Sequence, residues 1–118
     1  MIVRIWRTGL DESRADEYER FARERSLPMF QKQPGCVGVF FTRTEQGRAV
    51  ITLWENETAV HQLESDPSYR ATVEAITATR FLRRPQVVET LEAGEGWLNE
   101  RVARELLDAE RRSPAGDL

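Results

Sequence analysis

Residues 36–54 read CVGVFFTRTEQGRAVITLW and carry the clearest structural signal in the chain. β-Branched and aromatic residues dominate positions 36–42 and 48–54, as is typical of β-strands. The polar segment between them, Glu-Gln-Gly at 45–47, favours a tight turn. We therefore predict a β-hairpin with strands over 36–42 and 48–54.

The segments before the hairpin predict a strand and then a helix. Residues 2–8, IVRIWRT, have the composition of a strand and end at a glycine. Ser13 is placed to cap a helix, in which apolar residues follow at three- and four-residue spacings. Pro28 interrupts this spacing and suits the first position of a further helical turn, which Pro34 and Gly35 bring to an end.

The segments after the hairpin repeat the order of helix and strand. Asn56 and the Asp66-Pro67 pair each favour a helix start, because Asn and Asp cap helices and Pro fits the first turn. Residues 86–91, QVVETL, predict a fourth strand. The order β-α-β-β-α-β indicates an α+β, ferredoxin-like fold, in which a four-stranded antiparallel sheet carries both helical connections on one face.

The length of 118 residues suits one domain. We expect residues 1–94 to form the ferredoxin-like domain. Residues 95–118 are expected to add an extra C-terminal helix, docked through Trp97. An apolar stripe at helical spacing supports this extension.

Composition excludes several classes of function. A net charge of −3 argues against a nucleic-acid partner, which requires a basic surface. No apolar run approaches the roughly 20 residues that span a membrane, and the N-terminus lacks a signal-peptide pattern, so we expect a cytoplasmic protein. A single His and a single Cys cannot build a metal site, and no metal is expected.

The predicted strands are apolar on both faces, although two helical connections can cover only one face of the sheet. In the third strand, for example, Ile51 and Leu53 alternate with Val50 and Trp54. Burial of both faces predicts a second subunit packed sheet against sheet, that is, a homodimer. The alternative is a monomer whose C-terminal helix folds back over the open face.

Four segments carry a resemblance to a known family. They are IVRIW at 2–6, PGCVG at 34–38, LWEN at 53–56 and SDPSY at 65–69. In this order and spacing they resemble the antibiotic biosynthesis monooxygenase (ABM) domains of the dimeric α/β-barrel superfamily, over about residues 1–92. The resemblance implies a homodimer with a pocket between sheet and helices, and a small aromatic or polyketide-like substrate.

Some members of this family resemble oxygenases that use no cofactor. Their deprotonated substrate passes an electron to oxygen, while the protein supplies a dry pocket and stabilises the oxyanion. The anthrone-oxidising branch keeps a Trp that Trp54 matches, but its Asn, Tyr and Arg positions fall here on Val50, Val60 and Val73.

Another branch degrades haem. It uses an Asn on the first strand, with a Trp and a His on the second helical connection. Trp6, Leu63 and Val73 occupy the corresponding positions, so we do not expect haem degradation.

Three residues are candidates for the chemistry itself. His61 titrates near neutrality and is the candidate base for a phenolic substrate, or else a surface histidine. Arg4 and Arg80 lie on apolar faces, where an arginine needs an anion or an acceptor, and both are expected to face an oxyanion. The alternative is a structural salt bridge, for example to Glu89.

Three aromatic residues are candidates for binding the substrate. Trp6 and Trp54 suit stacking on a planar ligand, although packing in the core is the alternative for Trp54. Tyr69 offers a phenol to the pocket, or fills the core with its hydroxyl in water.

Three functions follow, and all require the dimer. The first is a cofactor-independent monooxygenase acting on a small aromatic molecule. The second is a module of the same fold that binds such a ligand without turnover. The third is an assembly domain whose C-terminal helix clasps a partner subunit.

Overall fold

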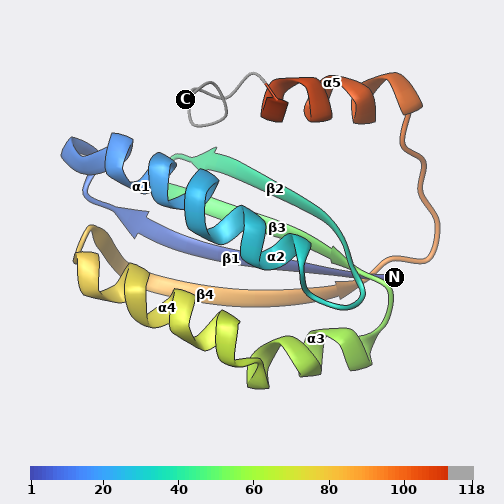
Figure 1. Cartoon of the computed structure of the whole chain (residues 1–118), viewed down its shortest axis with the longest axis horizontal. Coiled ribbons are helices and arrows are strands. Elements are labelled where there is room, and N and C mark those ends of the chain that lie inside the picture. Colours follow the sequence, from blue (N-terminus) through green and yellow to red (C-terminus); the bar gives the residue numbers. More distant parts are fainter. Residues whose placement is uncertain (112–118) are drawn as a thin grey trace.

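A four-stranded antiparallel sheet forms the frame of the chain, in a computed structural model that describes residues 1–111 (Figure 1). The strands are β1 (Ile2–Leu10), β2 (Cys36–Thr44), β3 (Gly47–Trp54) and β4 (Leu82–Glu92), in the spatial order β2-β3-β1-β4. This confirms the α+β, ferredoxin-like fold, with the hairpin β2–β3 at one side of the sheet.

The first helical connection is one nearly continuous rod. It consists of η1 (Glu12–Arg14), α1 (Ala15–Phe21), the π-helical η2 (Ala22–Ser26) and α2 (Leu27–Gln31). The predicted cap was off by two residues, because the Asp11 carboxylate accepts from the Ser13 backbone N–H at 3.1 Å. Pro28 lies in the first turn of α2, directly after the π-helical segment, which ends with the Leu27 N–H donating to the Ala22 carbonyl.

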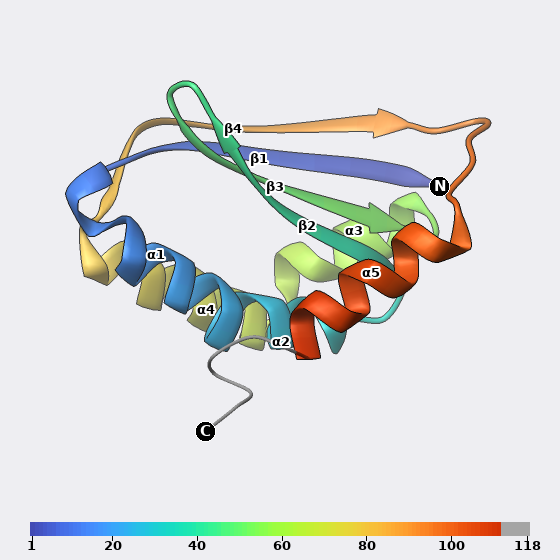
Figure 2. The ribbon, with the colours of Figure 1, turned by 90° about the horizontal axis from the view of Figure 1, so that it is seen from above.

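The second connection is broken into two helices, α3 (Glu57–Ser65) and α4 (Pro67–Thr79). Both predicted caps are present: Asn56 accepts from the backbone N–H of Ala59 at 2.9 Å, and Asp66 from that of Tyr69 at 3.0 Å. Figure 2 shows the helices of both connections on the same side of the sheet. Within residues 1–111, no helix covers the other side.

Strand register separates the residues of the two sheet faces. Arg4 pairs with Thr52 and Trp6 with Val50, and these four side chains belong to the face that the helices cover. Their neighbours in sequence alternate to the open face, where the half-buried residues Val3, Ile5, Phe40, Ile51 and Leu53 gather. The open face therefore has the apolar centre that the sequence predicted, and it also carries the Arg7–Glu89 ion pair.

The C-terminal helix α5 (Glu100–Arg111) does not cover the open face. It lies beyond the β2 edge, at the end of an extended connection (Figures 1 and 2). Trp97 is 83% exposed and does not pack against the described part of this chain. Residues 112–118 of the predicted extension lie outside the described part of the chain.

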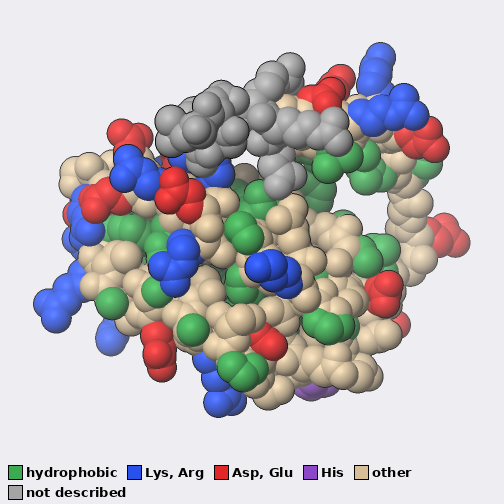
Figure 3. Space-filling model, viewed as in Figure 1, with side chains coloured by type: hydrophobic (Ala, Val, Ile, Leu, Met, Phe, Trp, Pro, Cys, Tyr) green, Lys and Arg blue, Asp and Glu red, His purple; other side chains and the backbone are tan. Residues whose placement is uncertain are grey.

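Apolar side chains of α5 face the body of the molecule beside an open gap (Figure 3). Val102, Leu106 and Leu107 of α5 remain 41–52% exposed, and Leu98, which precedes the helix, is 57% exposed. No helix of the described residues is long and apolar enough to cross a membrane.

Candidate active site

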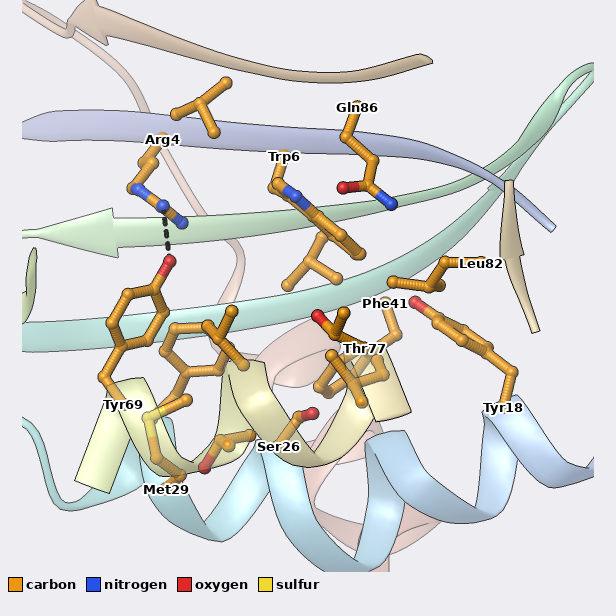
Figure 4. A pocket seen from close by; sticks show the side chains of 16 residues that line it. Arg4, Trp6, Tyr18, Ser26, Met29, Phe41, Tyr69, Thr77, Leu82 and Gln86 are labelled. Atoms are coloured by element: carbon orange, nitrogen blue, oxygen red, sulfur yellow. Dashed lines mark hydrogen bonds between the residues drawn. The ribbon is translucent and has the colours of Figure 1, made fainter. Parts of the chain in front are cut away.

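A cavity of about 150 Å³ lies between the sheet and the helices (Figure 4). Its wall is mainly apolar and comes from all layers of the fold, including Trp6, Met29, Phe30, Phe41, Val50, Ile76 and Leu82. The lining residues that are exposed belong to α4 (Val73, Thr77) and β4 (Gln86, Val88), so the cavity opens between these two elements. An apolar pocket with a few polar groups is typical of a small-molecule site.

Among the described residues, Arg4 is the one charged residue in this wall, and it is only 6% exposed. Its Nη2 donates to the Tyr69 hydroxyl at 3.0 Å, and its Cζ lies 5.7 Å from the centroid of the same ring. No acidic side chain of the described residues forms an ion pair with it. Because a guanidinium carries five N–H donors, most of the hydrogen-bonding capacity of Arg4 remains for a ligand or for water.

Tyr69 is held in place by the start of α4. Asp66 accepts from the Tyr69 backbone N–H and from Gln33 Nε2, each at 3.0 Å, and also from the Ser68 hydroxyl. These bonds, that from the Ser68 hydroxyl above all, hold the pKa of the Asp66 carboxyl below its usual value. The Asp66-Pro67 helix start therefore orients the phenol that meets Arg4.

Tyr18 is a cavity residue that the sequence analysis missed. It is 3% exposed, and its ring meets Phe81 edge-on with centroids 5.9 Å apart. Burial raises the pKa of Tyr18 to about 12, so its hydroxyl stays neutral at pH 7. The three- and four-residue spacing of Tyr18 from the apolar residues around it is typical of a buried helix face, but such spacing does not show whether the space beneath that face is filled.

The structure brings together three of the predicted site residues, Arg4, Trp6 and Tyr69, in the cavity wall. Trp54 is not among them. Its side chain is fully buried in the core, and its Nε1 donates to Thr52 Oγ1 at 2.7 Å. The alternative of core packing therefore holds for Trp54, and its assignment to substrate binding is corrected.

Arg80 does not line the cavity either. Helix α4 ends at Thr79, and Arg80 adopts a left-handed conformation with φ of 62°, which takes its exposed side chain off the apolar helix face. The proposed ion pair with Glu89 also belongs elsewhere: Glu89 lies on the open face and binds Arg7 at 3.0 Å.

His61 lies on α3 with its side chain 68% exposed, 3.8 Å from Glu57. It borders a separate surface hollow and not the cavity, because it falls on the outward side of α3. The structure therefore places His61 at the surface, as in the alternative stated for it, and outside the cavity. Within residues 1–111, no cluster of His, Cys, Asp or Glu suits a metal ion.

Known structures share this architecture. The ActVA-Orf6 monooxygenase of Streptomyces coelicolor, solved with nanaomycin D, is 19% identical, with a TM-score of 0.67 over 83% of this chain and 91% of its own. SnoaB of Streptomyces nogalater, a cofactor-independent oxygenase solved as a mutant, is 18% identical, with a TM-score of 0.64 over 80% and 94%. At such identities the likeness establishes the fold alone.

A protein of unknown function from Nitrosomonas europaea, NE2512, is 17% identical and has a TM-score of 0.68 over 83% of this chain and 93% of its own. No curated protein sequence matches the chain. The family model for antibiotic biosynthesis monooxygenases matches residues 1–75, which is more than half of the 118 residues. The chain therefore belongs to the antibiotic biosynthesis monooxygenase family.

Proposed function

We propose that the chain is a cofactor-independent monooxygenase that oxidises a small aromatic, polyketide-like molecule in the cavity beneath the helices. The observation that carries this proposal is Arg4, a buried guanidinium with no acidic partner among the described residues, facing an apolar space. Such a group stabilises an anion much more strongly than it would in water.

The chemistry follows from an ionised substrate. An acidic C–H that is conjugated with an aromatic ketone loses its proton, and Arg4 stabilises the enolate oxygen that forms. The enolate passes one electron to O2, the two radicals join to form a C–O bond, and the protonated hydroperoxide loses water. A CH2 group and O2 thus become a C=O group and water, and the electrons balance without a further reductant.

The cavity wall offers no carboxylate or imidazole as a base among the described residues. We therefore propose that water at the cavity mouth, between α4 and β4, accepts the proton from the substrate. Arg4 makes this transfer easier, because its charge lowers the pKa of the substrate. The Tyr69 hydroxyl, which accepts from Arg4, fixes the orientation of the guanidinium. Trp6 supplies a flat wall against which an aromatic substrate packs.

Oxygen uptake with anthrone as the probe substrate tests this proposal, with anthraquinone followed by its absorbance. The wild type should accelerate both above the rate in buffer, and Arg4→Met should lose at least about tenfold of that acceleration. Arg84→Met, at an exposed position of β4, is the matched control and should behave as wild type. No acceleration with anthrone or hydroxylated anthrones would contradict the proposal.

A second copy of the chain is the partner that we propose for the open sheet face. Its half-buried residues Ile5, Phe40 and Ile51 form an apolar surface that neither the helical connections nor α5 cover. Ile5→Arg should convert a dimer to a monomer in sedimentation velocity, whereas Ala78→Arg, on the exposed side of α4, should not. A wild type that sediments as a monomer at high concentration would contradict the dimer.

The exposed apolar side chains of α5 favour a further role in assembly, in which this helix clasps the second subunit. Removal of residues 95–118 tests this role separately from the sheet interface. We expect the truncated chain to dissociate at a higher protein concentration than the full chain. An unchanged dimer would exclude the clasp and leave the sheet interface in place.

A further inference from the structure

The hydroxyl of Tyr18 has no hydrogen-bond partner within the described part of the chain, although the residue is 97% buried and lines the cavity. Its ring packs against two neighbours. The centroid of the Phe81 ring lies 5.9 Å from that of Tyr18, and Cζ of Arg48 lies 5.8 Å from the same centroid. Buried phenol hydroxyls normally find an acceptor. The Tyr18 hydroxyl is not one of the fully buried polar atoms without a partner, so it is reached from the cavity, and its acceptor must come from what the cavity holds.

Tyr18 and Arg4 mark opposite ends of this cavity. Tyr18 packs in the cluster around Leu10 and Phe81, whereas Tyr69, the partner of Arg4, packs against the cluster around Trp54. Figure 4 shows the Tyr18 hydroxyl directed inward near Leu82, with the Arg4–Tyr69 pair at the far end. Apolar side chains, among them Trp6 and Phe41, fill the wall between them.

The two ends differ in what they can bind. Arg4 offers several charged N–H donors and suits an anionic oxygen. A Tyr18 hydroxyl that keeps its proton at pH 7 is a neutral donor and suits an uncharged acceptor such as a ketone oxygen. A volume of about 150 Å³, open at one side, suits one or two rings between these groups.

We propose that the cavity selects a flat ligand with an oxygen at each end: an anionic oxygen bound by Arg4 and a carbonyl oxygen that accepts from Tyr18. Tyr18 is then a residue that determines specificity by rejecting ligands whose distal end is apolar. This inference rests on the cavity of the proposed function, and it concerns binding and not turnover.

Three naphthalene probes separate the two contacts by fluorescence titration under anaerobic conditions. 6-Acetyl-2-naphthoate carries both oxygens, 6-isopropyl-2-naphthoate keeps the shape and the carboxylate, and 2-acetyl-6-isopropylnaphthalene keeps only the ketone. The wild type should bind the first probe about fivefold more tightly than the second, since one neutral hydrogen bond distinguishes them. It should bind the third probe at least about tenfold more weakly than the first.

Two variants assign the contacts. Tyr18→Phe should remove the preference for the acetyl over the isopropyl probe and leave the isopropyl affinity unchanged, while Arg4→Met should weaken both carboxylates. Thr42→Val is the matched control, because the Thr42 hydroxyl lies outside the cavity wall and donates to the Ala49 carbonyl at 3.0 Å. It should keep the wild-type preference.

A preference for the acetyl probe that survives in Tyr18→Phe would overturn the proposal, and so would its absence from the wild type. The wild-type comparison needs no variant and remains decisive if Tyr18→Phe does not fold. Because no oxygen is present, a negative result in the anthrone assay leaves this test intact. Conversely, if the protein oxidises anthrone but does not prefer the acetyl probe, the specificity role of Tyr18 is overturned, whereas the proposed oxygenase function stands.

Discussion

Within residues 1–111, two arginines are buried beneath the helices, and their interaction partners differ. Arg48, 5% exposed, lies with Glu12 at 3.2 Å and Glu19 at 3.8 Å, and it also donates to the Gly47 carbonyl at 2.9 Å. Arg4, 6% exposed, meets only the neutral hydroxyl of Tyr69 among the described residues. Both side chains start from the helix-covered face of the sheet, so burial alone does not separate them.

The difference between the two arginines separates a structural role from a binding role. A buried charge costs free energy unless opposite charge and hydrogen bonds compensate for it. At Arg48 two glutamates provide the opposite charge, although its buried Nε has no hydrogen-bond partner among the described residues, and we assign this arginine to the fold. At Arg4 the compensation is incomplete, and an anionic ligand would complete it.

The largest effect on stability is expected from Arg48→Met. This change removes the cation from two carboxylates and should lower the free energy of unfolding by about 2 kcal/mol, measured by urea denaturation. Arg43→Met is the control, because Arg43 binds the same Glu19 at 2.8 Å from a position where its side chain is 75% exposed. Its loss should cost under about 1 kcal/mol. Equal losses in the two variants would contradict a special role for the buried arginine.

Replacing Arg4 by Met should raise the free energy of unfolding slightly or leave it unchanged, whereas the same replacement at Arg48 should lower it. Met keeps much of the apolar contact of the arginine stem but removes a buried charge that lacks a carboxylate. We expect Arg4→Met to unfold at the wild-type free energy or up to about 1 kcal/mol above it, with an unchanged dependence on urea. A loss as large as that of Arg48→Met would make Arg4 structural and would remove the basis for the binding role.

The fold and part of the site were predictable from the sequence, for identifiable reasons. The alternation along 48–54 correctly separated the two sheet faces, and the caps at Asn56 and Asp66 correctly began two helices. Alternation also brings Arg4 and Trp6 onto one face. These predictions needed only local periodicity and local hydrogen bonds.

The incorrect predictions concern two features that local sequence does not determine. One is the residue at which a helix ends, and the other is whether neighbouring side chains fill the space around a residue. Arg80 continues the helical spacing of α4, but the helix ends one residue before it. Trp54 and Trp6 have the same character in sequence, yet one fills the core and the other borders a cavity. Tyr18 was missed because periodicity identifies a buried face without revealing an unfilled volume beneath it.

The smallest expected effect is on the pH dependence of stability. It comes from Asp66, whose carboxylate caps helix α4 near Arg4 and does not form an ion pair with that arginine. Asp66 holds Tyr69 through the backbone, and its pKa lies below the usual value chiefly because of the Ser68 hydroxyl. A lowered pKa in the folded state means that the unfolded chain takes up the proton first. The contribution of Asp66 to stability is therefore present above about pH 4 and is lost as the pH falls through the lower, folded-state pKa.

Asp66→Asn isolates this contribution, because Asn also caps helices but does not titrate. Between pH 6 and pH 3 the urea midpoint of the wild type should fall further than that of Asp66→Asn, and Ser68→Ala should lie between them. The difference should be smaller than the effect of Arg48→Met, since Asp66 is partly exposed to water. Parallel pH profiles for the wild type and Asp66→Asn would mean that the carboxyl titrates alike in the folded and unfolded chains. The start of α4, and with it the position of Tyr69 against Arg4, would then owe nothing to the charge of Asp66.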